Sequence, residues 1–219
     1  SLATAVLRDA AGAPPVPRVA AFRRWAREQA FSPVLGRGLV DAPRVDLSLD
    51  SPLTVEGGRE RPFQAWAADI ETRRIAANAP AAVGYHDETR LLYRSDAFAE
   101  AREDGPEPRT VHLGVDLFAP EGTGVFAPLD GTVLSVQRNP APLDYGPTVI
   151  LEHAGEDGRP FFTLYGHLEE EVLERLHASL VARAFSSSRR APPKAASKPW
   201  RSSACLSPSV FHISVCSDP

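Results

Sequence analysis

The segment His112-Leu-Gly-Val-Asp116 opens the part of the chain whose pattern decides the fold. After it come Gly122, Val125-Phe-Ala127 and Gly131-Thr-Val133, in which glycines separate short apolar runs, as in strands joined by turns. Further along, Tyr165-Gly-His167 ends another β-rich run. Imidazole and carboxylate are ligands of catalytic zinc, and a further histidine can act as a general acid or base. The pattern therefore indicates a β domain with a metal-dependent hydrolytic site.

Residues 109–176 consist of apolar runs separated by turn signals, which predicts an antiparallel sheet or a small β-sandwich. The expected strands are Val111–Leu117, Gly124–Ala127, Thr132–Gln137, Thr148–His153 and Phe161–Leu168, with a helix beginning in Glu169–Leu176. The preceding region is expected to contain helices over Val19–Phe31 and Pro62–Ala77, and strands at Val45–Leu49 and Leu91–Arg94. The predicted fold class is a mainly β core with an α-containing N-terminal accessory region, α+β overall.

The last part of the chain differs in composition from the rest. Residues 178–219 hold 11 of the 17 serines, both lysines and both cysteines, with six basic residues against one acidic residue. A disordered basic tail or translation in a shifted frame would each explain this, and we favour the shifted frame because three residue types change together. The predicted organisation is a linker and accessory region over 1–108, a partial β domain over 109–176 and a disordered or out-of-frame tail over 177–219.

Composition excludes several classes of function. The net charge is −4 and 24% of residues are charged, so neither nucleic acid nor an anionic membrane is an expected partner. No apolar run is long enough to span a membrane, and the N-terminus lacks the pattern of a signal peptide. We therefore expect a cytoplasmic location. The chain contains no methionine, which predicts that it is a fragment of a longer reading frame.

The quoted motifs together resemble the lysostaphin-type zinc metallopeptidases, also called the duplicated hybrid motif fold. The matching pattern is His112-x-Gly-x-Asp116, Gly122-x-x-Val-x-Ala127, Gly131-x-Val133, Val149-Ile-Leu-Glu-His153 and Tyr165-x-His167-Leu168. The resemblance covers about a third of the chain, and the succession of motifs is more specific than any one of them.

The resemblance implies roles for three residues. In the family, the His and Asp of the first motif bind zinc, and a later His-x-His pair supplies the third ligand and one catalytic histidine. Carried over, His112 and Asp116 are expected zinc ligands, and His167 is the expected catalytic histidine. The implied activity is hydrolysis of peptide bonds, mostly peptidoglycan cross-links, by zinc-activated water. The expected partner is thus a peptide or a peptidoglycan-like substrate.

The sequence departs from the family at one decisive place. No His-x-His pair follows residue 168, and His212 stands alone in Val210-Phe-His-Ile-Ser214. Two protein ligands hold zinc less well than three, so zinc binding is expected to be weak or absent. The enzyme assignment is therefore left open. A single histidine is a weak motif, so His212 as a replacement ligand is the less favoured hypothesis. His153 is expected to be structural, and His86 to lie in a solvated loop.

Two other classes of protein share features with this sequence. Biotinyl and lipoyl domains share the Gly/Val/Ala half-motif but need an acceptor lysine, and residues 109–177 contain none. The alternative that stays open is a non-catalytic peptidase-like module of a larger cytoplasmic protein. Residues 1–176 resemble the central segment of bacterial fusions that join a phosphotransferase-like kinase domain, a peptidase-like domain and a pyridoxal-phosphate aminotransferase. That resemblance implies covalent fusion to further domains.

Overall fold

The computed structural model describes residues 17–90, 99–100, 107–108, 111–141, 143–155, 158–176, 200–201 and 209–217. The helices are α2 (Pro17–Glu28), α3 (Phe63–Ala76) and a third over 170–176. The main sheet contains β1 (Arg44–Val45), β4 (Ala82–Gly84), β9 (Val115–Ala119), β11 (Thr132–Asn139), β12 (Gly146–Ala154), β13 (Pro160–Gly166) and β15 (Ser209–Ser217). Two-stranded ribbons join β2 (Val55–Glu56) to β3 (Arg59–Glu60), β5 (Glu88–Thr89) to β8 (Val111–His112), β6 (Ala99–Glu100) to β7 (Glu107–Pro108) and β10 (Gly124–Val125) to β14 (Trp200–Arg201).

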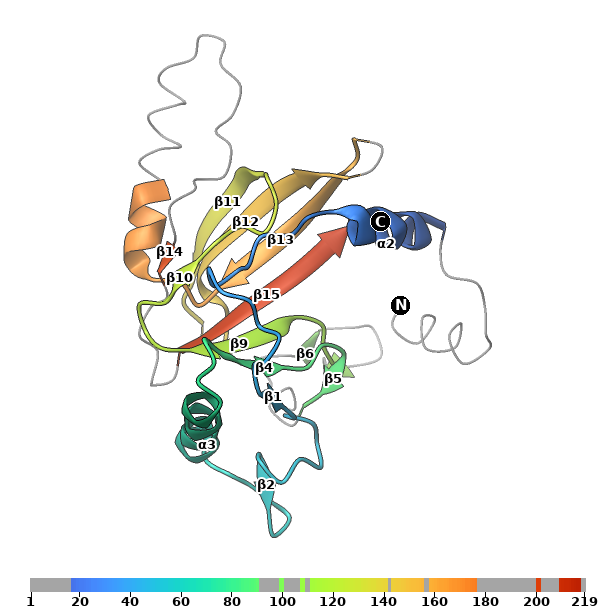
Figure 1. The fold of residues 1–219 in the computed structure, drawn as a ribbon. Coiled ribbons are helices and arrows are strands. Elements are labelled where there is room, and N and C mark those ends of the chain that lie inside the picture. Colours follow the sequence, from blue (N-terminus) through green and yellow to red (C-terminus); the bar gives the residue numbers. More distant parts are fainter. Residues whose placement is uncertain are drawn as a thin grey trace.

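The fold is organised around the seven-stranded sheet, whose order is β1-β4-β9-β15-β13-β12-β11 (Figure 1). Every neighbouring pair is antiparallel except β1 and β4. This confirms the predicted class, mainly β in the core and α+β overall. Strands β1 and β4 come from the expected accessory region and β15 from the expected tail, so the sheet crosses both predicted boundaries. The domain boundaries themselves stay a prediction. Within the described residues, no helix is long and apolar enough to span a bilayer.

Most predicted strands of the core are present, and the differences have local causes. The expected strand Val111–Leu117 is divided into β8 and β9, with a break over 113–114. The expected strand Val45–Leu49 keeps only its first residue, in β1. It ends there because the side chain of Asp46 accepts a hydrogen bond from the Ser48 N–H and turns the chain. The expected strand Leu91–Arg94 lies outside the described residues.

The three predicted helices are present, and the two of the N-terminal region pack through aromatic side chains. The rings of Phe22 and Trp25 on α2 lie 5.1 and 5.3 Å from the ring of Phe161 on β13. On α3, Ile70 is buried and Trp66 packs edge-on against Phe118 of β9. Ile75, near the end of the same helix, is exposed.

Strand β15 lies in the segment where the sequence predicted no regular structure. Its backbone pairs with β9 on one side and with β13 on the other, so it joins the two halves of the sheet. A signal for it exists: Val210, Phe211, Ile213 and Val215 are β-branched or aromatic residues of the kind that strands favour. The serine-rich composition around this run hid it.

Strand β9 is buried on both of its faces. Leu117 and Ala119 belong to a core cluster with Tyr165 of β13, whereas Phe118 belongs to a second cluster with Ile70 of α3. Side chains alternate along a strand, so Asp116 lies on the same face as Phe118, toward the elements of the N-terminal region. The position of this carboxylate is therefore set by both parts of the chain.

We predict that Gly131→Ala destabilises the fold by about 1–3 kcal/mol. A Cβ atom there would lie 2.7 Å from Nδ1 of the buried His153 and 2.9 Å from the Glu152 carbonyl oxygen, and neither can move freely. Gly38→Ala is the matched control, since its Cβ would meet no atom within 4 Å. Urea unfolding measures both variants; equal free energies of unfolding for the two would contradict the prediction.

We also predict that Tyr165 makes stability fall at alkaline pH. Burial raises the pKa of Tyr165 from 10.0 to about 12. Between these values the unfolded chain loses the phenolic proton while the folded chain keeps it, so stability present below pH 10 is lost as pH rises toward 12. Between about pH 9 and about pH 11, wild type should lose about 1 kcal/mol more than Tyr165→Phe, measured by urea unfolding. Equal losses would show that the phenol has no raised pKa.

Candidate functional site

The two expected zinc ligands lie beside each other in the structure. His112 ends β8 and Asp116 follows in β9, and both side chains are buried. Nε2 of His112 lies 3.5 Å from Oδ1 of Asp116. Nδ1 of His112 lies 3.5 Å from the carbonyl oxygen of Tyr85, which can only accept a hydrogen bond and therefore favours the tautomer protonated at Nδ1. The imidazole consequently presents Nε2 toward the carboxylate.

The second oxygen of Asp116 is held by an arginine from the N-terminal region. Nη1 of Arg90 donates to Oδ2 of Asp116 at 2.5 Å, and Nε of Arg90 donates to Oε2 of Glu88 at 2.7 Å. The other oxygen of Glu88 accepts a hydrogen bond from the Leu47 N–H at 2.7 Å. Glu88 is also the register partner of His112 in the β5–β8 ribbon. A continuous chain of contacts thus leads from the backbone of Leu47 to the carboxylate of Asp116.

The two carboxylates beside Arg90 keep its guanidinium group ionised. Burial alone would lower the pKa of Arg90, but the carboxylates of Asp116 and Glu88 outweigh it and raise that pKa above its ordinary value. Burial raises the pKa of Glu88, while the Leu47 N–H and Arg90 act in the opposite direction. With both acids ionised, the Arg90 cation contacts two anions, and these three side chains together carry a net negative charge.

The expected catalytic histidine, His167, follows the last residue of β13. Its backbone φ is 55°, a conformation that residues other than glycine rarely adopt. Two hydrogen bonds hold this turn, from the His167 N–H to the Tyr145 carbonyl at 2.7 Å and from the Leu168 N–H to the Pro147 carbonyl at 3.0 Å. The side chain is half-buried. Such strain is found where surrounding structure over-determines the backbone, often at functional sites.

Strand β15 places the two halves of the site in one row across the sheet. His212 is the register partner of Asp116 on β9 and of Gly166 on β13. Neighbouring strands lie about 4.8 Å apart, so Asp116 and Gly166 are about 10 Å apart across β15. His167 is the next residue after Gly166. The row therefore brings the expected ligands and the expected catalytic histidine to one region, with His212 at the position between them.

Two residues at this site, His112 and Asp116, match zinc ligands in type and in spacing. Zinc takes imidazole nitrogen and carboxylate oxygen at about 2.0 Å, which places tetrahedral ligand atoms about 3.3 Å apart. The separation of His112 Nε2 and Asp116 Oδ1, 3.5 Å, is close to this value. Among the side chains that the structure describes, no group of three His, Cys, Asp or Glu residues could hold a metal ion.

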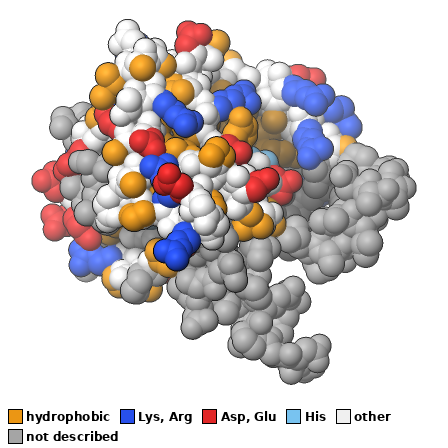
Figure 2. All heavy atoms as spheres, turned by 90° about the horizontal axis from the view of Figure 1, so that it is seen from below, with side chains coloured by type: hydrophobic (Ala, Val, Ile, Leu, Met, Phe, Trp, Pro, Cys, Tyr) orange, Lys and Arg blue, Asp and Glu red, His pale blue; other side chains and the backbone are white. Residues whose placement is uncertain are grey.

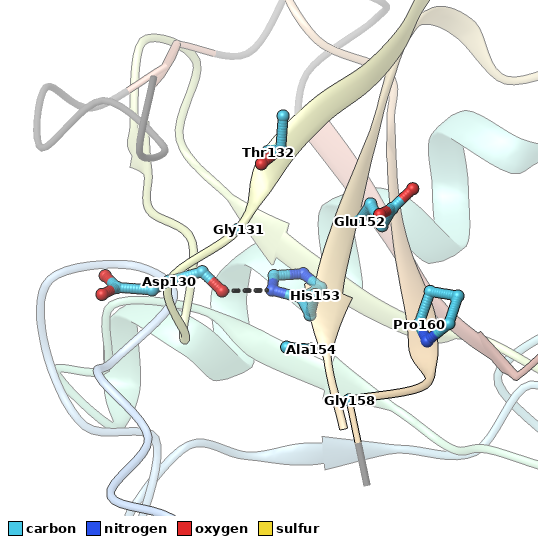
Figure 3. A pocket seen from close by; sticks show the side chains of 8 residues that line it. All are labelled: Asp130, Gly131, Thr132, Glu152, His153, Ala154, Gly158 and Pro160. Atoms are coloured by element: carbon cyan, nitrogen blue, oxygen red, sulfur yellow. Dashed lines mark hydrogen bonds between the residues drawn. The ribbon is translucent and has the colours of Figure 1, made fainter. Parts of the chain in front are cut away.

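The other described histidines have different surroundings. The side chain of His153 is buried and lines the floor of an open pocket, shown in Figure 3. Its Nδ1 lies 2.9 Å from the carbonyl oxygen of Asp130. Its Nε2 lies 2.7 Å from Oγ1 of Thr163, and its ring stacks on Phe161. Both nitrogens are thus engaged, which agrees with the structural role expected for it. His86 is exposed and donates from Nδ1 to the Leu113 carbonyl at 2.7 Å.

An open groove runs beside the His112–Asp116 pair. It shares Tyr85 and Glu88 with the surroundings of the pair, and its complete lining is Asp46, Ser48, Leu49, Asp50, Tyr85, His86, Asp87, Glu88 and Thr89. The hydrogen bonds from Ser48 lower the pKa of Asp46, so this carboxyl is ionised at neutral pH. Over the face in Figure 2, basic and acidic side chains are interspersed. The described part of that face is not dominated by one sign of charge.

The part of the chain with the buried His112–Asp116 pair is a β domain, in which β8 pairs with β5 and β9 lies in the seven-stranded sheet. The family described as Peptidase family M23 matches residues 110–178, which include His112, Asp116 and His167. This segment, about a third of the chain, is therefore an M23 peptidase-like domain. No curated protein matches the chain.

Two solved structures are similar to the chain. The NMR solution structure of lysostaphin has 18% identity and a TM-score of 0.38; the similarity covers 64% of this chain and 44% of that one. A mutant catalytic domain of the prophage-encoded M23 protein EnpA from Enterococcus faecalis has 21% identity and a TM-score of 0.31, covering 51% of this chain and 72% of that one. This chain thus spans less than half the length of the lysostaphin structure.

Sequence reasoning missed Arg90 and Glu88. They stand two positions apart, so on an extended segment they lie on one face, but the surrounding run Asp87-Glu-Thr-Arg90 suggests a solvated loop. Their burial follows from pairing of β5 with β8 and from packing beneath Gly84, which no local pattern signals.

Proposed function

We propose that the M23 domain of this chain is a zinc endopeptidase that hydrolyses peptide bonds of the peptidoglycan cross-link type. The observation that carries this proposal is the buried His112–Asp116 pair, 3.5 Å apart, inside the segment that matches the peptidase family. A zinc ion bound there would supply an activated water and a Lewis acid for the scissile carbonyl. The matching substrate is a peptide or a peptidoglycan-like peptide.

The roles of the protein groups follow from their contacts. Tyr85 orients the His112 ring through its carbonyl oxygen, which leaves Nε2 as the ligand atom. Asp116 offers Oδ1 as the second ligand atom while Arg90 holds Oδ2. His167, half-buried after β13, is proposed to protonate the departing amine as a general acid.

The third ligand is proposed to be His212. Its support is the backbone register, which places it directly across from Asp116 on the neighbouring strand β15. A single histidine is a weak motif in sequence. The pairing of β15 with β9 gives His212 a neighbour, Asp116, that is distant in the sequence. A site of two histidines and one carboxylate would have the number of protein ligands usual for catalytic zinc.

A second candidate is a non-catalytic peptidase-like module of a larger cytoplasmic protein, covalently fused to further domains. The observation that favours it is the ion pair between Arg90 and Asp116, which supplies the carboxylate with a cation in the absence of zinc. In this case the cluster serves folding alone, and the purified protein retains no zinc. Under this second candidate, the protein is proposed to be cytoplasmic.

Zinc content separates the two candidates. The full chain, purified at neutral pH, should hold about one zinc ion, measured by atomic absorption, and should lose it in His112→Ala and in His212→Ala. His167→Ala should retain zinc but cleave a peptidoglycan cross-link peptide about 100- to 10,000-fold more slowly, because only the proton donor is gone.

The control is His86→Ala, which removes an exposed histidine and should change neither zinc content nor turnover. Wild type without zinc would favour the non-catalytic module. Zinc retained in His112→Ala would overturn the assignment of His112 as a ligand. Zinc retained in His212→Ala, but lost in His112→Ala, would overturn only the assignment of His212 as the third ligand.

A further inference from the structure

We propose that Arg90 is a positioning residue for the metal site: clamped by Glu88, it holds Oδ2 of Asp116 and thereby directs Oδ1 toward Nε2 of His112. This inference rests on the proposed function, because it concerns how the zinc ligand is oriented. It assigns part of the site to the N-terminal region, outside the segment that matches the peptidase family.

The two carboxylate oxygens of Asp116 have different partners. Arg90 Nη1 bonds to Oδ2, whereas the oxygen that faces His112 is Oδ1. A carboxylate held at one oxygen cannot turn about its Cβ–Cγ bond without breaking that bond. Arg90 therefore occupies the oxygen that a monodentate ligand does not need, and leaves the other aimed at the imidazole.

The second step is that Arg90 is itself fixed. Its Nε is bonded to Glu88, and Glu88 is bonded to the Leu47 N–H. The side chains of Arg90 and Glu88 are 8% and 5% exposed, so water does not compete for these contacts. Positioning by an arginine works best in this form, because its planar fork makes two directed bonds from one rigid group.

The third step is packing. Gly84 lies above the pair: a Cβ there would be 3.2 Å from Cβ of Asp116 and 3.4 Å from Nη2 of Arg90. Among the described side chains, Nη2 of Arg90 is the buried polar atom without a hydrogen-bond partner. An ion pair that leaves a buried donor unsatisfied is a poor source of stability, which points to a role in orienting Asp116 instead.

The fourth step is charge. Among the described side chains of the cluster, Glu88 and Asp116 carry two negative charges and Arg90 one positive charge, a balance that favours a metal cation. Arg90 thus stabilises the ionised form of Asp116 without cancelling the negative charge that would favour zinc binding.

The test measures zinc affinity of the full chain by competition with a chromophoric chelator, in wild type, Arg90→Gln and Arg90→Lys. Loss of the clamp in Arg90→Gln should weaken zinc binding about 10- to 100-fold. Arg90→Lys keeps the charge but cannot bond Asp116 and Glu88 in the same fixed geometry, so it should restore only part of the affinity. Glu88→Gln, which loosens the clamp without removing it, should give an intermediate loss.

The matched control is Arg74→Gln on α3, which also removes an arginine that grips one carboxylate with two bonds, to Glu71, at 2.6 and 2.7 Å. It should lower the thermal midpoint of unfolding without changing zinc affinity. A merely structural Arg90 would behave in the same way. If Arg90→Gln does not fold, Arg90→Lys and Glu88→Gln carry the test.

The outcomes are distinct from those of the proposed function. Wild type that binds no zinc, or binds it equally after His112→Ala, overturns the proposed function and this inference with it. Zinc binding that depends on His112 but is unchanged in folded Arg90 and Glu88 variants overturns the positioning role alone. Tighter zinc binding in Arg90→Gln also overturns it, since the arginine would then compete with the metal for Asp116.

Discussion

The buried carboxylate of Asp116 is the constraint on which the rest of the site depends. Strand β9 has both faces covered, so a charge on it cannot be solvated and must be met by groups of the protein. The structure meets it with the Arg90 guanidinium on one oxygen and places the His112 imidazole by the other. Residues in or beside β4, β5 and β8 contact this one carboxylate-bearing residue.

Meeting that constraint ties together regions that are distant in sequence. Arg90 and Glu88 precede the peptidase motif, and they reach Asp116 because β5 pairs with β8 and β4 pairs with β9. From the other side, β15 pairs with β9 and β13 and places His212 across from Asp116. The M23 segment alone contains neither contribution. A domain boundary drawn from motifs therefore divides a sheet that folding makes continuous.

The described histidines differ in their surroundings. His153 has both ring nitrogens engaged, with a backbone carbonyl and with Thr163, and its ring is stacked on Phe161. His112 instead directs one nitrogen at a carboxylate, and His167 sits on a strained turn at the end of β13. Surroundings, rather than residue type, distinguish His153 from the two histidines proposed for chemistry.

The sequence by itself determined the β character of residues 109–176, the helices near 17–28 and 63–76, and the pairing of His112 with Asp116. These depend on local periodicity, glycine turns and a short motif, all of which act between residues close in the chain. Only the tertiary structure decided that Arg90 and Glu88 are buried beside Asp116 and that the run around His212 enters the sheet. Those positions depend on strand pairing between distant segments, and pairing carries no local signature because any extended strand offers the same backbone hydrogen bonds.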